Sequence, residues 1–134
     1  MKKLLLFDID GTLLISRGAG RRSMQEALGA LCGQSISTEG VDFSGRTDPQ
    51  IIRDILVRNG VGDVENRLPD ALEAFSEAFF KYFDPGQVRA LPGAVELVHR
   101  LQEEPDMQLA LLTGNMQRTG YLKVDAIGLG DVFP

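Results

Sequence analysis

The feature that most constrains this chain is an apolar run that ends in two acidic residues one position apart, LLLFDIDGTL at residues 4–13. Leu4–Phe7 is too short for a helix and does not alternate with polar residues, so it predicts a central parallel strand covered on both faces. In an extended segment residues i and i+2 point to the same side, which directs Asp8 and Asp10 into one small volume. Because open α/β sheets bind ligands at the carboxyl ends of their strands, the run predicts a site around these two acids.

The closeness of Asp8 and Asp10 has an electrostatic consequence, because two like charges need a cation or a shared proton between them. A divalent ion with oxygen ligands is the simplest solution, and Mg²⁺ combines one or two carboxylates with water and a substrate phosphate. We therefore expect Asp8 and Asp10 to be metal ligands. The alternative is a strand followed by an ordinary Asp-Gly turn, which accounts for Asp10 and Gly11 and leaves Asp8 without a role.

A second apolar run, Gln108–Leu112, ends in the small polar residues Thr113, Gly114 and Asn115. Thr113 offers a hydroxyl, and Gly114 lets backbone N–H groups come close to the oxygens of a phosphate. The helix expected directly after this loop would aim the positive end of its dipole at the same place. A strand, a turn and a helix cap without a ligand is the alternative.

The residues between the two apolar runs carry the spacing of amphipathic helices. We expect one helix from about Ser16 to Gly33, a second after the capping sequence Thr47-Asp48-Pro49, a third from about Pro69 to Phe83 and a fourth after Leu91-Pro92-Gly93. This pattern predicts an α/β protein with a parallel-sheet core interrupted by a helical insertion. We place the core at residues 1–15 and 88–134 and the insertion at residues 16–87.

Composition excludes several classes of protein. Hydrophobic residues make up 43% of the 134-residue chain, enough for a buried core, while no apolar stretch approaches the ~20 residues of a membrane span. The net charge of −5 argues against a nucleic-acid surface. The apolar start is interrupted by Asp8 too early for a signal peptide, and the lone Cys32 cannot form an internal disulfide. We therefore expect a cytoplasmic protein without nucleic-acid or membrane partners.

The segment Asp8–Leu13 resembles the first motif of the haloacid dehalogenase (HAD) superfamily, Asp-x-Asp-Gly-Thr-Leu/Val, at every position. The resemblance implies a Rossmann-like core, Mg²⁺ and an aspartyl-phosphate intermediate. It makes Asp8 the nucleophile and Asp10 the general acid and then base, with Gly11 and Thr12 beside the phosphate. An Asp at the second acidic position is typical of the family's phosphatases and phosphomutases, and it argues against dehalogenation and ion transport.

Other segments extend this resemblance. Thr113 is similar to the family's second motif, which gives it a catalytic role with Gly114 and Asn115 as further phosphate contacts. The helical insertion resembles the cap of the phosphoglycolate phosphatase-like branch, in which Arg46 of Gly45-Arg46-Thr47-Asp48 would contact the leaving group of the substrate. The alternative for Arg46 is a solvated side chain beside a turn and a helix cap. The implied substrate is a small phosphorylated metabolite.

The sequence departs from the family pattern after the second motif. A complete family member continues past the second motif to a basic residue near the nucleophile and to an acidic pair that completes the metal site. Here Lys123 is the candidate for the basic role, with a solvated helix lysine as the alternative, and no acidic pair follows. We therefore expect the amino-terminal portion of a family member, with weak Mg²⁺ affinity and little activity on its own. A phosphomutase and a truncated noncatalytic binding protein remain alternatives to a phosphatase.

Overall fold

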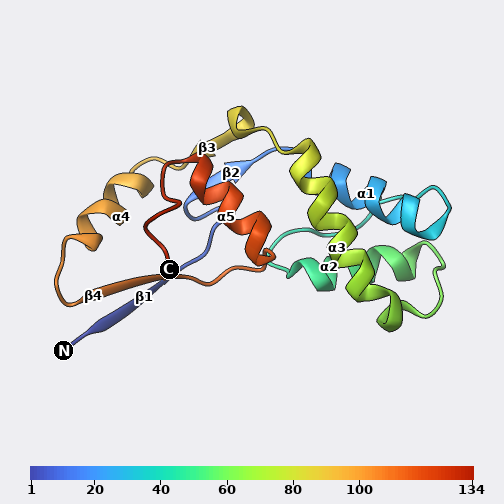
Figure 1. The fold of residues 1–134 in the computed structure, drawn as a ribbon, viewed down its shortest axis with the longest axis horizontal. Helices are drawn as coiled ribbons and strands as arrows, with labels where there is room; N and C mark the ends of the chain where they lie inside the picture. The colour runs from blue at the N-terminus through green and yellow to red at the C-terminus, as the bar shows by residue number, and fades with distance from the viewer. The chain divides into compact units, whose positions relative to one another are not determined.

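The structure is a computed structural model that describes all residues, 1–134. Figure 1 follows the elements along the chain: β1 (Lys3–Phe7), β2 (Leu14–Ser16), α1 (Ala19–Cys32), α2 (Asp48–Arg58), α3 (Val64–Tyr82), the 3-10 helix η1 (Pro85–Gln87), β3 (Val88–Ala90), α4 (Ala94–Gln102), β4 (Met107–Leu111) and α5 (Gln117–Ala126).

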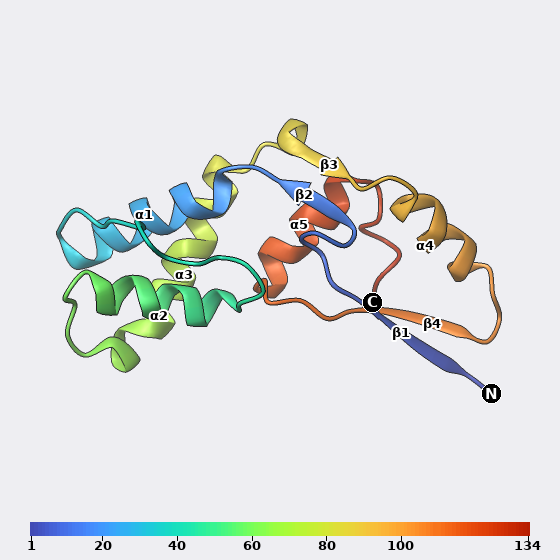
Figure 2. The ribbon, with the colours of Figure 1, turned by 180° about the vertical axis from the view of Figure 1, so that it is seen from behind.

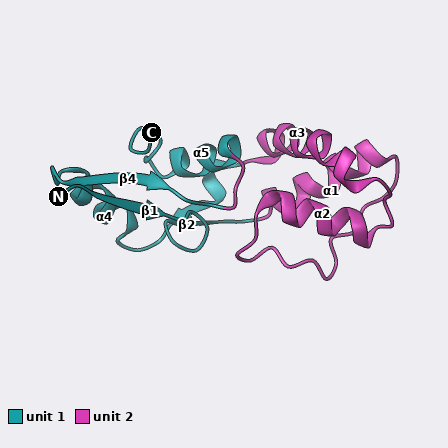
Figure 3. Cartoon of the chain, turned by 90° about the horizontal axis from the view of Figure 1, so that it is seen from below, with its two compact units in different colours: residues 1–17, 84–113, 117–134 teal, residues 18–83, 114–116 magenta.

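The chain divides into two compact units, coloured separately in Figure 3. The first, here called the strand unit, comprises residues 1–17, 84–113 and 117–134. The second, here called the helical unit, comprises residues 18–83 and 114–116. The sequence did not indicate that the short segment 114–116 groups with the helices rather than with the strand that precedes it.

The strand unit is built on the parallel pair β1 and β4, in which Leu5 lies opposite Leu109. A second, antiparallel pair joins β2 and β3, with Ile15 opposite Arg89. This pair was not predicted, because two strands of three residues are too short for a pattern to show. The buried core combines residues from the turn after β1, strands β2 and β4, helices α4 and α5 and the end of the chain: Ile9, Leu13, Leu14, Val98, Leu109, Val124, Leu129 and Phe133. The parallel pair with its helices confirms the predicted α/β class.

The prediction that β1 is covered on both faces was wrong. Leu5 and Phe7 pack against the core, whereas Leu4 is 58% and Leu6 is 53% exposed. The reason is that β1 has a single neighbouring strand and alternates its side chains between two faces, of which only one meets the core. A continuous apolar run therefore corresponds here to a half-covered strand.

The helical unit is held together by α3, which packs against both α1 and α2. The view from behind in Figure 2 shows α1 and α2 in front of α3. The core consists of one apolar face from each helix: Met24 and Leu28 of α1, Ile51, Ile52, Ile55 and Leu56 of α2, and Ala71, Phe75 and Phe79 of α3. Such burial along one stripe is what the amphipathic spacing predicted.

The ends of the first two helices follow the predicted signals, and the start of the third does not. Gly33 closes α1 in the left-handed region at φ 66°, and Thr47 caps α2. Helix α3 begins at Val64 instead of near Pro69. A proline crowds the carbonyl four residues earlier, which here lies in the first turn of α3. The free energy gained by burying the long apolar face beyond this turn outweighs the cost of that crowding.

No helix of the structure combines the length and apolar composition that crossing a membrane requires.

Candidate active site

The loop after β1 presents two carboxylates on either side of a buried residue. Asp8 and Asp10 are exposed, whereas Ile9 between them is completely buried. The backbone N–H of Ile9 donates to Oδ1 of Asp8 at 2.8 Å. This alternation anchors the loop through Ile9 and leaves both acids exposed, while the convergence of the two carboxylates on one volume stays a prediction.

The turn that follows is fixed by its own backbone. The N–H groups of Thr12 and Leu13 donate to the carbonyl of Ile9 at 3.2 and 2.9 Å, and the N–H of Gly11 donates to the carbonyl of Leu14 at 2.8 Å. Gly11 has φ 77°, a conformation that a residue with a Cβ adopts only with strain. The turn buries Leu13 and Leu14 and leaves Gly11 and Thr12 exposed beside the two acids.

Lys123 of α5 lies against one of the two acids. Its Nζ donates to both carboxylate oxygens of Asp10, at 2.9 and 3.0 Å. Lys123 is only 8% exposed, so the alternative of a solvated helix lysine is wrong. A buried ammonium group requires a charged partner, and a carboxylate that accepts two hydrogen bonds from it supplies one.

Thr113 leaves the sheet at the same edge as Asp8. Strands β1 and β4 are parallel with Phe7 opposite Leu111, and the N–H of Leu112 continues the ladder by donating to the carbonyl of Phe7 at 2.8 Å. The two strands therefore end side by side, and the loops that follow them begin at the same edge of the sheet. Within the strand unit this adjacency brings together the ends of both sequence motifs.

The next residues, 114–116, bind within the helical unit. The N–H of Asp48 donates to the carbonyl of Gly114 at 2.8 Å, and the N–H of Met116 donates to Oδ2 of Asp48 at 2.8 Å. A Cβ on Gly114 would lie 2.5 Å from the carbonyl oxygen of Arg46. The sequence predicted that glycine here permits the approach of a ligand, and the structure adds the close approach of another backbone segment.

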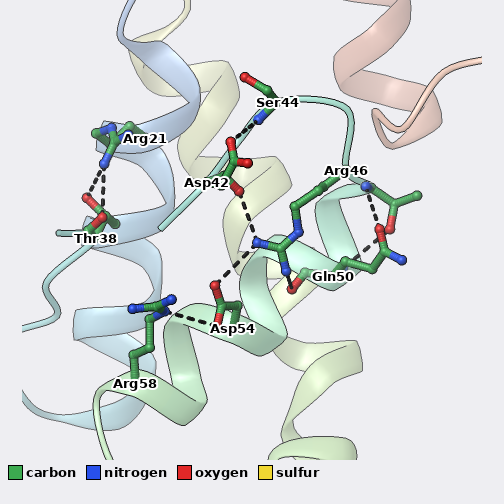
Figure 4. A network of polar contacts seen from close by, with 9 residues as sticks. Arg21, Thr38, Asp42, Ser44, Arg46, Gln50, Asp54 and Arg58 are labelled. Carbon is green, nitrogen blue, oxygen red and sulfur yellow. Dashed lines mark hydrogen bonds and ion pairs between the residues drawn. The ribbon is translucent and has the colours of Figure 1, made fainter. Parts of the chain in front are cut away.

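Arg46 is engaged inside the helical unit, as Figure 4 shows. Its guanidinium donates to the carbonyls of Asp42 and Gln50 at 3.0 and 3.2 Å and to Oδ2 of Asp54 at 3.3 Å. Arg58 donates to the other oxygen of Asp54 at 3.0 Å. Desolvation alone would raise the pKa of Asp54, but the hydrogen bonds and positive charges of the two arginines outweigh it and hold the pKa below its usual value.

The structure brings together no group of three or more His, Cys, Asp or Glu side chains that could hold a metal ion. Asp8 and Asp10 nevertheless fit Mg²⁺, because this ion is commonly held by one or two carboxylates and completes its shell with water and a phosphate. Lys123 already binds both oxygens of Asp10, so its ammonium group competes with a cation for that carboxylate. Asp8 is consequently the better of the two side-chain ligands.

The sequence of the chain matches the profile of the family described as haloacid dehalogenase-like hydrolase over residues 5–134. The matched range includes the first apolar run apart from Leu4, the turn after β1, the helices and the second apolar run. The chain therefore belongs to the haloacid dehalogenase-like hydrolase family. No match to a curated protein sequence was found.

Solved structures support the same fold. A hydrolase from Pseudomonas syringae matches with a TM-score of 0.66 at 22% identity, covering 95% of this chain and 56% of that protein. A predicted phosphoglycolate phosphatase from Haemophilus somnus matches with a TM-score of 0.60 at 21% identity, covering 98% and 60%. CbbY from Rhodobacter sphaeroides in complex with phosphate gives 0.55 and 22%, covering 97% and 57%. The chain thus spans less than two thirds of the length of these proteins.

Proposed function

We propose that this protein acts as a magnesium-dependent phosphatase of the phosphoglycolate phosphatase-like branch and hydrolyses a small phosphate monoester through an aspartyl-phosphate intermediate. The observation that carries the proposal is the loop after β1, where Asp8 and Asp10 face outward from a rigid turn and Lys123 lies against Asp10. Family membership and the phosphate complex of a protein with the same fold add support. The helical unit serves as the cap that excludes water and selects the substrate.

In the proposed first step a carboxylate oxygen of Asp8 attacks phosphorus. A bond forms between Asp8 and phosphorus as the bond between phosphorus and the ester oxygen breaks, and Asp10, entering with a proton, gives that proton to the leaving oxygen. In the second step Asp10 takes a proton from the water that attacks the aspartyl phosphate. This releases inorganic phosphate and regenerates the carboxylate of Asp8. Lys123 donates to both oxygens of Asp10 and so holds the side chain that carries these proton transfers in one orientation.

The remaining residues bind the phosphate. The backbone N–H groups of Gly11 and Thr12, the hydroxyl of Thr113 and the backbone of Gly114 and Asn115 supply hydrogen-bond donors for its oxygens. The carboxylates of Asp8 and Asp10 would hold Mg²⁺. When bound, this ion supplies positive charge that offsets repulsion between the phosphate and the attacking carboxylate.

The test of this mechanism is the covalent intermediate. Rapid quenching during turnover of a phosphate ester, followed by intact-mass and peptide analysis, should reveal one added phosphoryl group on Asp8. Chelation of Mg²⁺ should abolish its formation. A phosphoryl group found only on another residue, or turnover that persists in excess chelator, would contradict the proposal. With a phosphosugar as substrate, release of inorganic phosphate identifies a phosphatase, whereas an isomeric phosphosugar as product identifies a phosphomutase.

For Arg46 we propose a role in the choice of substrate. Its backbone and side chain form the turn that precedes α2, and its charge suits an anionic leaving group. Arg46→Ala should change the ranking of natural phosphate esters more than it changes hydrolysis of a small generic ester. Arg58→Ala is the matched control, because Arg58 binds the same carboxylate of Asp54. If both variants change the ranking equally, the effect comes from Asp54 and the packing of α2, and the direct role of Arg46 is excluded.

A further inference from the structure

We infer that Arg21 of α1 is a positioning residue, which fixes the segment at residues 38–43 and, through it, the orientation of the Arg46 side chain. The inference rests on the proposed function, because the choice of substrate is assigned there to Arg46. It concerns contacts within the helical unit only. The sequence did not suggest it, since an exposed arginine on an amphipathic helix is ordinarily solvated.

The first observation is that Arg21 holds the segment at both of its ends. Its Nη1 donates to the carbonyl oxygen and to Oγ1 of Thr38, at 3.0 and 2.9 Å. Its guanidinium carbon lies 4.2 Å from the centroid of the Phe43 ring, within the range of a cation–π contact. Thr38 is 3% exposed, so the hydrogen bonds at this end are shielded from water and are stronger than exposed ones.

The second observation concerns the residues between these two anchors. The N–H of Val41 donates to the carbonyl of Thr38 at 3.2 Å, and Val41 is 6% exposed. The N–H of Ser44 donates to Oδ1 of Asp42 at 2.9 Å. The segment is therefore folded on itself between Thr38 and Phe43, and the position of Asp42 follows from the anchors on either side of it.

The third observation is that Asp42 supplies one of the three acceptors of the Arg46 guanidinium. Figure 4 shows this guanidinium between Asp42 and α2. Nη1 donates to the carbonyl of Asp42 at 3.0 Å, and the other two acceptors, the carbonyl of Gln50 and the carboxylate of Asp54, belong to α2. If Asp42 were not fixed, acceptors on α2 alone would hold a side chain with several rotatable bonds. Arg21 therefore sets one of the two sides between which Arg46 is held.

The first experiment follows the side-chain Nε–H signal of Arg46 by NMR in the ¹⁵N-labelled 134-residue chain, with the signal assigned by its loss in Arg46→Ala. Arg21→Ala should shift this signal and the backbone amides of residues 38–44. It should also lower the ¹H–¹⁵N heteronuclear NOE of the Arg46 Nε, because the side chain gains motion on the picosecond-to-nanosecond timescale. Arg21→Lys keeps a donor for Thr38 and a charge near Phe43, so it should restore part of these signals.

The matched control is Arg22→Ala. Arg22 is also exposed on α1, and its guanidinium carbon lies 4.1 Å from the centroid of the Tyr82 ring. Its ion pair is with Glu26 of the same helix, so its contacts do not involve the segment at residues 38–43. This variant should move signals of α1 and α3 and leave the Nε–H signal of Arg46 near its wild-type position.

The second experiment measures kcat and KM for phosphoglycolate, which has an anionic leaving group, and for p-nitrophenyl phosphate in an active preparation of the protein. Arg21→Ala should lower the ratio of the two kcat/KM values by about fivefold, the loss expected for one hydrogen bond, and mainly through the KM for phosphoglycolate. Because Arg21 acts through Arg46, adding Arg21→Ala to a protein that already carries Arg46→Ala should change the ratio no further.

Three results would overturn the inference: an unchanged Arg46 Nε–H signal in Arg21→Ala, equal changes of this signal in Arg21→Ala and Arg22→Ala, or a further change of the substrate ratio when Arg21→Ala is added to Arg46→Ala. If Arg21→Ala does not fold, Arg21→Lys decides, since loss of the planar group over Phe43 must move the Arg46 signal if the anchor exists. A substrate ratio that Arg46→Ala leaves unchanged would contradict the proposed role of Arg46 instead, and the NMR comparison would still test the positioning by Arg21.

Discussion

Two of the loops that carry proposed site residues are held by different forces. The turn at residues 8–14 is closed by backbone hydrogen bonds and one glycine with positive φ. The longer loop at residues 34–47 is held by side chains: Asn59 binds both the N–H and the carbonyl of Ser37, Arg21 binds Thr38, and Arg46 binds the carbonyl of Asp42. The first loop is specified locally, whereas the second depends on residues that are distant in sequence. We therefore expect side-chain substitutions in the first loop to change catalysis with little effect on stability, and substitutions that remove the contacts of the second loop to lower stability.

The largest expected effect is on chemistry in the first loop. Asp8→Asn keeps the shape of the side chain and removes its negative nucleophile, so turnover of any phosphate ester should fall by at least about 10³-fold in an active preparation of the protein. Because Asp8 is exposed, the melting temperature should change little. Steady-state kinetics and thermal unfolding of the same sample measure both quantities. Wild-type turnover in this variant would exclude Asp8 as the nucleophile.

The next effect is structural and concerns Gly114. Gly114→Ala places a Cβ 2.5 Å from the carbonyl oxygen of Arg46, and the required backbone shift should lower the free energy of unfolding by about 1–3 kcal/mol. The matched control is Gly20→Ala in α1, where a Cβ meets nothing within 4 Å. That change should stabilise the protein by roughly 0.5–1 kcal/mol, because alanine favours a helix. Chemical denaturation of both variants provides the comparison, and destabilisation of equal size in both would refute the steric argument.

A paired substitution tests the contrast between the loops directly. Asn59→Ala removes hydrogen bonds to Ser37 and to the carbonyl of Ile55, and should lower the free energy of unfolding by about 1–2 kcal/mol. Thr12→Ala changes an exposed side chain in a turn that its backbone closes, and should alter stability by less than about 0.5 kcal/mol. Urea unfolding curves measure both values. The reverse order would show that the turn at residues 8–14 also depends on side chains.

The smallest effect is on pH dependence and comes from Asp54. Its pKa is lowered in the folded protein because the arginine hydrogen bonds outweigh desolvation. The stabilisation is therefore fully present above the usual carboxyl pKa and is lost as the pH falls through the lowered value. Asp54→Asn should have a lower melting temperature than the wild type at pH 7, with the difference shrinking under acidic conditions. A difference independent of pH would assign the effect to packing instead of charge.

The parts of the molecule that were predictable are those in which a local pattern determines the structure. The turn after β1, the glycine that ends α1 and the cap at Thr47 each depend on neighbours within a few residues. The ion pair of Lys123 with Asp10 joins residues 113 positions apart, so the sequence left its alternative open. The bond from Met116 to Asp48 was missed altogether, because Asp48 already had a local explanation and no periodicity links two distant loops.

The exposed face of β1 has a consequence for how the 134-residue chain behaves at high concentration. Leu4 and Leu6 present bare apolar side chains, and in a two-stranded ladder each strand also has one edge with unpaired backbone groups. Apolar surface beside an open edge is the combination that lets strands of separate molecules add to one another. Light scattering should therefore rise with protein concentration, and a lysine in place of Leu6 should improve colloidal stability while leaving the covered face of β1 intact.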